Sequence, residues 1–95
     1  MTNPVIDKHG TQEWYQNGKR HRADGPAIID ADGSQSWYKN DKLHRTDGPA
    51  IIYANGKHEW WLNEKRYYDV NDYVKEIFTH NSKEKMVFLL KWSAQ

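Results

Sequence analysis

The chain has 95 residues, a formal net charge of +1 and no cysteine. Its length predicts one small domain, the lack of cysteine excludes disulfides and thiolate metal sites, and the near-neutral charge argues against a dedicated nucleic-acid binder. Aliphatic residues are few, but there are five Trp, six Tyr and two Phe. Since each such ring buries about 150–250 Å², we expect a core built mainly of aromatic side chains.

Two features of the sequence indicate the cellular compartment. The first residues lack the basic start and apolar run of a signal peptide. The longest apolar run, residues 86–90, is far too short to cross a membrane. We therefore expect a soluble cytoplasmic protein that makes no membrane contact.

A tandem repeat organises most of the chain, with Trp14, Trp37 and Trp60 at equivalent places 23 positions apart. Residues 14–33 share 14 identities in 20 positions with residues 37–56, and the third copy, from Trp60, loses the pattern near its end. Such self-similarity predicts stacked units with atypical end copies. We expect a single domain over 1–95, with three tandem hairpin repeats over 5–68 and a helical segment over 69–95.

Each repeat is predicted to consist of β-strands separated by tight turns. Asn17-Gly18, Asp32-Gly33 and Asn55-Gly56 favour two-residue type I′ hairpin turns, in which both residues have positive φ. The runs Ala27–Ala31 and Ser34–Lys39 have the length and composition of strands. The fold class is therefore mainly β: a continuous antiparallel β-meander of about eight or nine short strands.

The segment after the repeats has a helical pattern instead. An apolar stripe at helical spacing over 69–80 predicts an amphipathic helix, capped by Asp69 or Asn71 and ended by Asn81-Ser82. Ser82 is a candidate cap for the segment that follows. Met86–Leu90 favours a second helix, with a strand as the alternative. We expect a C-terminal helical cap of one or two helices.

The repeat resembles known repeats. Its period, glycine placement and aromatic positions resemble the MORN-repeat superfamily, whose units form β-hairpins in an extended sheet. The closer resemblance is to a variant, Trp-Tyr-x-Asn-Gly-x-x-His-Arg-x-Asp-Gly-Pro-Ala, found in small proteins of tailed bacteriophages and giant viruses. Residues 14–27 carry this motif in full, and 37–50 carry it with Asp41 in place of Gly. The resemblance implies scaffolding and protein binding, and it assigns no catalytic residues.

The His-Arg-x-Asp-Gly-Pro segment is the part of the repeat that most resembles a binding or catalytic site. Two such clusters, one repeat apart, include arginines that are able to grip a carboxylate or phosphate. The structural interpretation is favoured: each Asp bonds the loop backbone or the nearby Arg, and each His packs between hairpins. The candidate partner-binding residues are the recurring His21, Arg22, His44 and Arg45 and the non-recurring Trp61, Tyr67 and Tyr68.

These patterns favour a non-enzymatic protein-binding module, with no cofactor. The five histidines show no metal-ligand spacing, and Ser34, Ser36 and Ser82 lack a nucleophile context. Two alternatives stay open: binding of a nucleotide or single-stranded nucleic acid through the aromatic and basic face, and a small enzyme with an unrecognised site. The viral resemblance suggests a phage factor that engages or inhibits a host defence protein in the host cytoplasm. A free edge near Val5–Asp7 predicts a homodimer.

Overall fold

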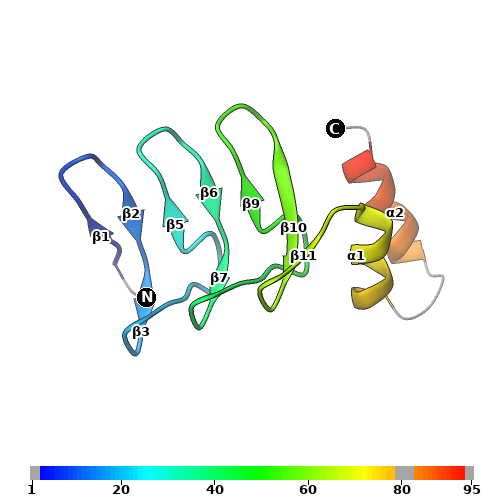
Figure 1. The fold of residues 1–95 in the computed structure, drawn as a ribbon, viewed down its shortest axis with the longest axis horizontal. Coiled ribbons are helices and arrows are strands. Elements are labelled where there is room, and N and C mark those ends of the chain that lie inside the picture. The colour runs from blue at the N-terminus through cyan, green and yellow to red at the C-terminus, as the bar shows by residue number, and fades with distance from the viewer. Residues whose placement is uncertain (1–2, 79–82, 94–95) are drawn as a thin grey trace.

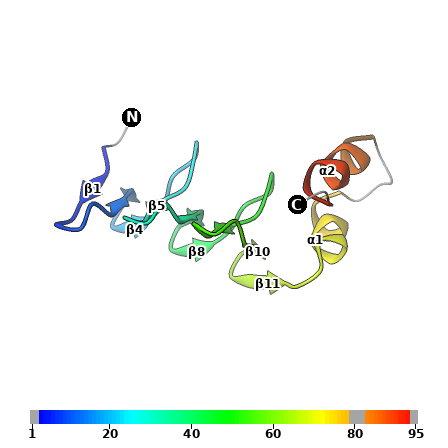
Figure 2. The same cartoon turned by 90° about the horizontal axis from the view of Figure 1, so that it is seen from above.

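The computed structural model of the protein describes residues 3–78 and 83–93. The molecule is elongated, with extents of 45 × 29 × 22 Å. Hairpin units stand in a row along the long axis, and two helices lie at the end of the row away from the N-terminus (Figure 1). Seen from above, the same step from unit to unit repeats along this axis (Figure 2).

The described residues form eleven strands and two helices. These are β1 (Val5–Ile6), β2 (Gln12–Glu13), β3 (Tyr15–Gln16), β4 (Lys19–Arg20), β5 (Ile28–Ile29), β6 (Gln35–Ser36), β7 (Tyr38–Lys39), β8 (Lys42–Leu43), β9 (Ile51–Ile52), β10 (His58–Leu62), β11 (Lys65–Tyr67), α1 (Val70–Ile77) and α2 (Lys83–Ser93). Seven strands pair antiparallel in the order β1-β2-β5-β6-β9-β10-β11, while β3-β4 and β7-β8 form separate ribbons. The predicted mainly β meander with a helical cap is confirmed.

The strands are more numerous than predicted because two of them are interrupted at a tryptophan. The Trp14 N–H donates to the Ala27 carbonyl (2.8 Å), whereas the Trp14 carbonyl accepts from the His21 N–H (3.1 Å). The strand thus changes partners within one residue and divides into β2 and β3. Trp37 divides β6 from β7 in the same way. In the third unit β10 runs unbroken through Trp60.

The turns only partly follow the prediction. Three Asn-led turns have positive φ at both central positions, as type I′ requires: Asn17-Gly18, Asn40-Asp41 and Asn63-Glu64. The type I′ prediction is wrong for Asp32-Gly33 and Asn55-Gly56, where of the two residues only the glycine has positive φ. The Asp30 carbonyl there accepts from the Gly33 N–H (2.9 Å), and the Asp30 N–H donates to Ser34 (2.8 Å). This is the three-residue loop in which a left-handed glycine follows a type I turn.

Contacts between hairpin tips explain why Asp41 and Glu64 occupy positions that favour glycine. Asp41 has φ of 68°. Its side chain accepts from the Arg20 N–H of the preceding unit (2.7 Å), and its own N–H donates to the Arg20 carbonyl (2.9 Å). The Glu64 N–H bonds the Leu43 carbonyl in the same manner (2.9 Å). These bonds between units offset the cost of an unfavourable backbone angle.

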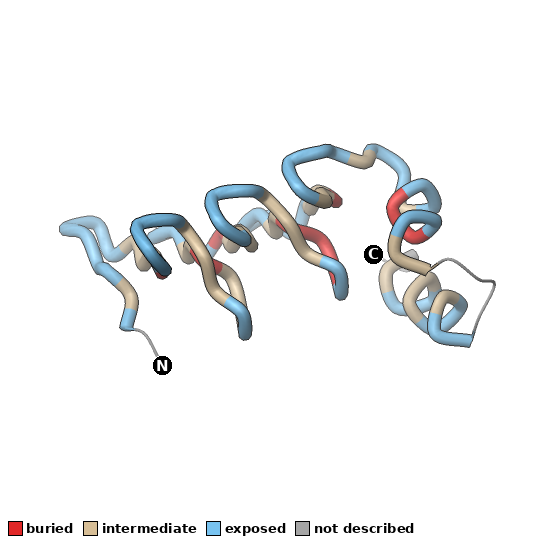
Figure 3. The backbone as a smooth tube through the Cα atoms, turned by 90° about the horizontal axis from the view of Figure 1, so that it is seen from below, coloured by how far each residue is buried: buried red, intermediate tan, exposed pale blue. Residues whose placement is uncertain are grey.

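The core lies between the third unit and the helices. Trp60, Tyr73 and Val74 form its buried centre, while the first units bury mainly a line of residues along the sheet (Figure 3). The Asp69 side chain caps α1 by accepting from the Asn71 N–H (2.9 Å). Both predicted helices are confirmed, including the helix favoured over a strand for residues 86–90. The predicted break and cap at Asn81-Ser82 lie outside the described residues.

Candidate functional site

The first His-Arg-x-Asp-Gly-Pro segment forms a loop, loop 1 (residues 21–26), that its own arginine closes. The guanidinium of Arg22 lies over the Trp14 ring, 3.9 Å from its centroid. Its Nε is 3.1 Å from the Asp24 carboxylate, and its Nη1 donates to the Pro26 carbonyl (3.2 Å). Arg22 is therefore held from three sides by groups of its own unit.

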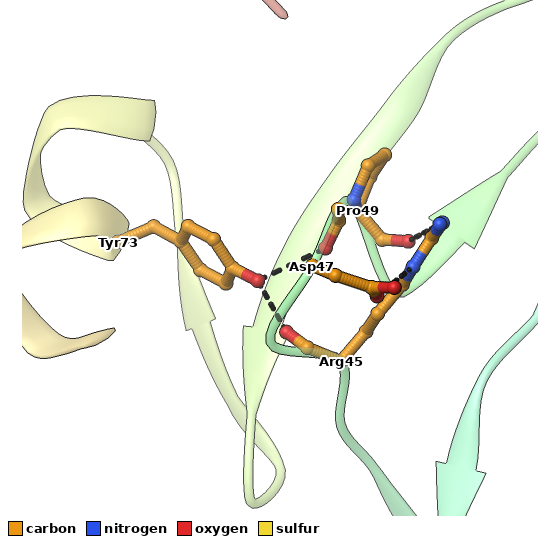
Figure 4. A network of polar contacts seen from close by, with 5 residues as sticks. Arg45, Asp47, Pro49 and Tyr73 are labelled. Atoms are coloured by element: carbon orange, nitrogen blue, oxygen red, sulfur yellow. Dashed lines mark hydrogen bonds and ion pairs between the residues drawn. The ribbon is translucent and has the colours of Figure 1, made fainter. Parts of the chain in front are cut away.

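Loop 2 (residues 44–49) repeats this arrangement. Arg45 lies 3.9 Å from the Trp37 centroid, its Nε is 2.8 Å from Asp47 and its Nη1 donates to the Pro49 carbonyl (3.0 Å) (Figure 4). A Cβ atom added to Gly48 would lie 2.7 Å from the Arg45 Cζ. A side chain at position 48 would therefore push the guanidinium from its place over Trp37.

The two histidines connect neighbouring units. The Nδ1 atom of His21 accepts from the Asn40 N–H (3.2 Å), and that of His44 accepts from the Asn63 N–H (3.0 Å). Burial, together with nearby Lys39, lowers the pKa of His44, which keeps its ring neutral and able to accept. The contacts of both His-Arg pairs are those that the structural interpretation predicts.

An open groove of about 780 Å³, which we call groove 1, separates the two loops. Trp37 and Tyr38 lie along it, Ala23 lines it from loop 1, and Thr46 lines it from loop 2. The four predicted residues His21, Arg22, His44 and Arg45 all line it as well. Because both arginines are paired with aspartates, the charges of the loops largely cancel, and Lys39 leaves a small positive excess.

On its other side loop 2 meets α1. The Tyr73 hydroxyl donates to the backbone carbonyls of Arg45 and Gly48, the latter at 3.0 Å (Figure 4). The side chain is fully buried, and burial raises its pKa well above the ordinary tyrosine range. The helical pattern predicted Tyr73 only as an apolar position, and the one signal of its polar role is a hydroxyl within an otherwise apolar stripe.

The other three predicted residues lie away from groove 1. Trp61 is half-buried, and its indole N–H donates to Glu59 (2.9 Å). Tyr67 packs against the core beside Tyr73. Tyr68 is 83% exposed, with the Arg66 guanidinium 4.4 Å from its ring centroid. The structure thus brings together the recurring residues and separates them from the non-recurring ones.

We searched the described residues for a metal site and for a membrane-spanning helix. Within residues 3–78 and 83–93, no three His, Asp or Glu side chains lie close enough together to hold a metal ion. Neither described helix has the length and apolar character needed to cross a membrane. No protein-family model, curated protein or solved structure matches the chain.

Proposed function

We propose that the protein is a non-enzymatic binding module whose docking surface for a partner protein is groove 1. One observation carries this proposal. Groove 1 is open between loops 1 and 2, whereas the corresponding surface one unit further along, beside loop 2, is covered by α1. The corresponding carbonyls and tryptophan one unit further along thus already contact a helix within this chain.

The chemistry of groove 1 also favours a protein partner. Aromatic side chains and arginines carry much of the binding energy at protein interfaces, and groove 1 presents Trp37, Tyr38 and two arginines. The guanidiniums are fixed by their own loops, with side chains only 24% and 16% exposed. A rigid surface loses little entropy on binding, which favours affinity.

The nature of the partner follows from the resemblance to repeats of phage proteins. It supports a host protein, such as a defence component, as the target in the host cytoplasm. This part of the proposal rests on the Trp-Tyr-x-Asn-Gly-x-x-His-Arg-x-Asp-Gly-Pro-Ala motif over residues 14–27.

The test is to fill groove 1 and measure binding. Ala23 and Thr46 line it from opposite walls, so Ala23→Trp and Thr46→Trp each place a large ring in it. Ala31 is exposed near the tip of a distant hairpin, which makes Ala31→Trp the matched control. Partners captured by the wild-type chain should be lost with both groove variants and kept with the control. Partners kept by all three variants would contradict the proposal, as would groove-dependent capture of a nucleotide or single-stranded nucleic acid.

A further inference from the structure

We propose that groove 1 accepts a tyrosine side chain presented by a helix of the partner protein. The inference rests on the proposed function and adds the chemistry of the partner. One repeat along the chain, the corresponding backbone carbonyls already accept a hydrogen bond from a tyrosine.

The occupied position lies between loop 2 and the end of the third unit. Tyr73, on α1, packs its ring against Trp60 with 4.7 Å between centroids. Its hydroxyl donates to the carbonyls of Arg45 and Gly48. A helix-borne tyrosine is therefore the group that fills this surface within the chain.

The corresponding groups of groove 1 are present but uncovered. A shift of one repeat turns Arg45, Gly48 and Trp60 into Arg22, Gly25 and Trp37. Among residues 3–78 and 83–93, none donates a hydrogen bond to the Arg22 or Gly25 carbonyl. Groove 1 thus repeats the acceptor pair and the aromatic wall without their donor.

One difference between the two positions determines which kind of side chain groove 1 favours. In groove 1 the Arg45 guanidinium lies over Trp37, whereas its counterpart one repeat on, Tyr68, turns outward and is 83% exposed. An incoming ring therefore meets a cationic surface over the tryptophan. Aromatic faces are attracted to guanidinium groups, so this difference favours an aromatic occupant.

The acceptor pair selects an aromatic group that carries a hydrogen-bond donor, and Tyr73 at the equivalent carbonyls points to tyrosine among such groups. Two carbonyl oxygens offer hydrogen-bond acceptors only, so they bind a phenol hydroxyl and leave phenylalanine without the bond. A phosphotyrosine would bring anionic oxygens, which are also acceptors, toward them. The expected partner therefore carries an unmodified tyrosine.

The experiment selects displayed peptides, long enough to form a helix in water, that bind the full wild-type chain. An excess of the Ala23→Trp variant is added as competitor, so that peptides binding outside groove 1 are removed. We expect peptides that share one tyrosine. Changing that tyrosine to phenylalanine should weaken binding about tenfold, the effect of losing one hydrogen bond of about 1.4 kcal/mol. Thr46→Trp should abolish binding and Ala31→Trp should preserve it.

Each other result has a definite meaning. Groove-dependent peptides that lack tyrosine, or that bind equally with phenylalanine, would overturn the tyrosine inference and leave the proposed function standing. A selection that yields no groove-dependent peptide would overturn both. If the chain forms a dimer in solution and either groove-filling variant dissociates it, groove 1 binds a second copy of the chain, and the inference is also overturned. Circular dichroism melts of the three variants establish that each is folded.

Discussion

Changing Tyr73 to phenylalanine removes the hydrogen bond between α1 and loop 2. The substitution keeps the buried ring and removes only the hydroxyl that bonds the Arg45 and Gly48 carbonyls. The two carbonyls share the single hydroxyl proton, so one hydrogen bond of about 0.5–1.5 kcal/mol net is lost. A buried acceptor left without a donor costs about 1–3 kcal/mol. Because Gly48 is buried, water replaces the lost donor poorly. We expect the free energy of unfolding to fall by about 1–3 kcal/mol.

Urea unfolding followed by tryptophan fluorescence measures this loss. With a slope of about 2 kcal/mol per molar urea, the midpoint should fall by about 1 M at an unchanged slope. The matched control is Tyr15→Phe, whose hydroxyl bonds Glu13 (3.2 Å) at an exposed site and should cost under about 0.5 kcal/mol. Equal midpoints for the two variants would refute the role assigned to the Tyr73 hydroxyl.

Three further predictions follow from the loops and the sheet edge. Gly48→Ala should displace Arg45, whose Cζ lies 2.7 Å from the added methyl position, and lower stability by about 1–2 kcal/mol through the lost cation–π contact and hydrogen bond; an unchanged thermal melt would contradict this. The lowered pKa of His44 means that the unfolded chain takes up a proton first as the pH falls through about 6.5, so stability should decrease below that pH. His44→Asn keeps an acceptor without the proton and should flatten the decrease between about pH 7 and 5, whereas His9→Asn, at an exposed position, should retain it; parallel slopes for both variants would argue against His44. Ile6 is 62% exposed on edge strand β1, so Ile6→Lys should lower the mass of the predicted homodimer in light scattering, and a monomeric wild-type chain would exclude that dimer.

The sequence predicted the features that local chemistry determines. The recurring Asn, Gly and Pro residues mark turns, and the apolar stripe from Val70 to Phe78, with Asp69 before it, marks α1. The division of strands at Trp14 and Trp37 was missed because it depends on which segment each half of the strand pairs with. Strand pairing across the sheet is not a property of the local sequence.

The distinction between an open and a filled groove was also beyond the sequence. His21-Arg22 and His44-Arg45 look alike in the chain and make the same contacts within their loops. They differ because α1 lies against loop 2, a contact between residues 25 and 28 positions apart in the chain. Repetition in a sequence therefore identifies equivalent surfaces but not which of them the fold itself covers.

The bonds between units have a consequence for how such a protein changes in length. Loop 1 bonds the second unit and loop 2 bonds the third through the same pairs of atoms. One more copy of the repeat, inserted between them, would meet matching donors and acceptors on both sides. Each insertion would add one more groove while α1 continued to cover the last one. The number of grooves, and with it the avidity for a partner with repeated binding segments, can thus increase by duplication of the repeat while the C-terminal helices stay unchanged.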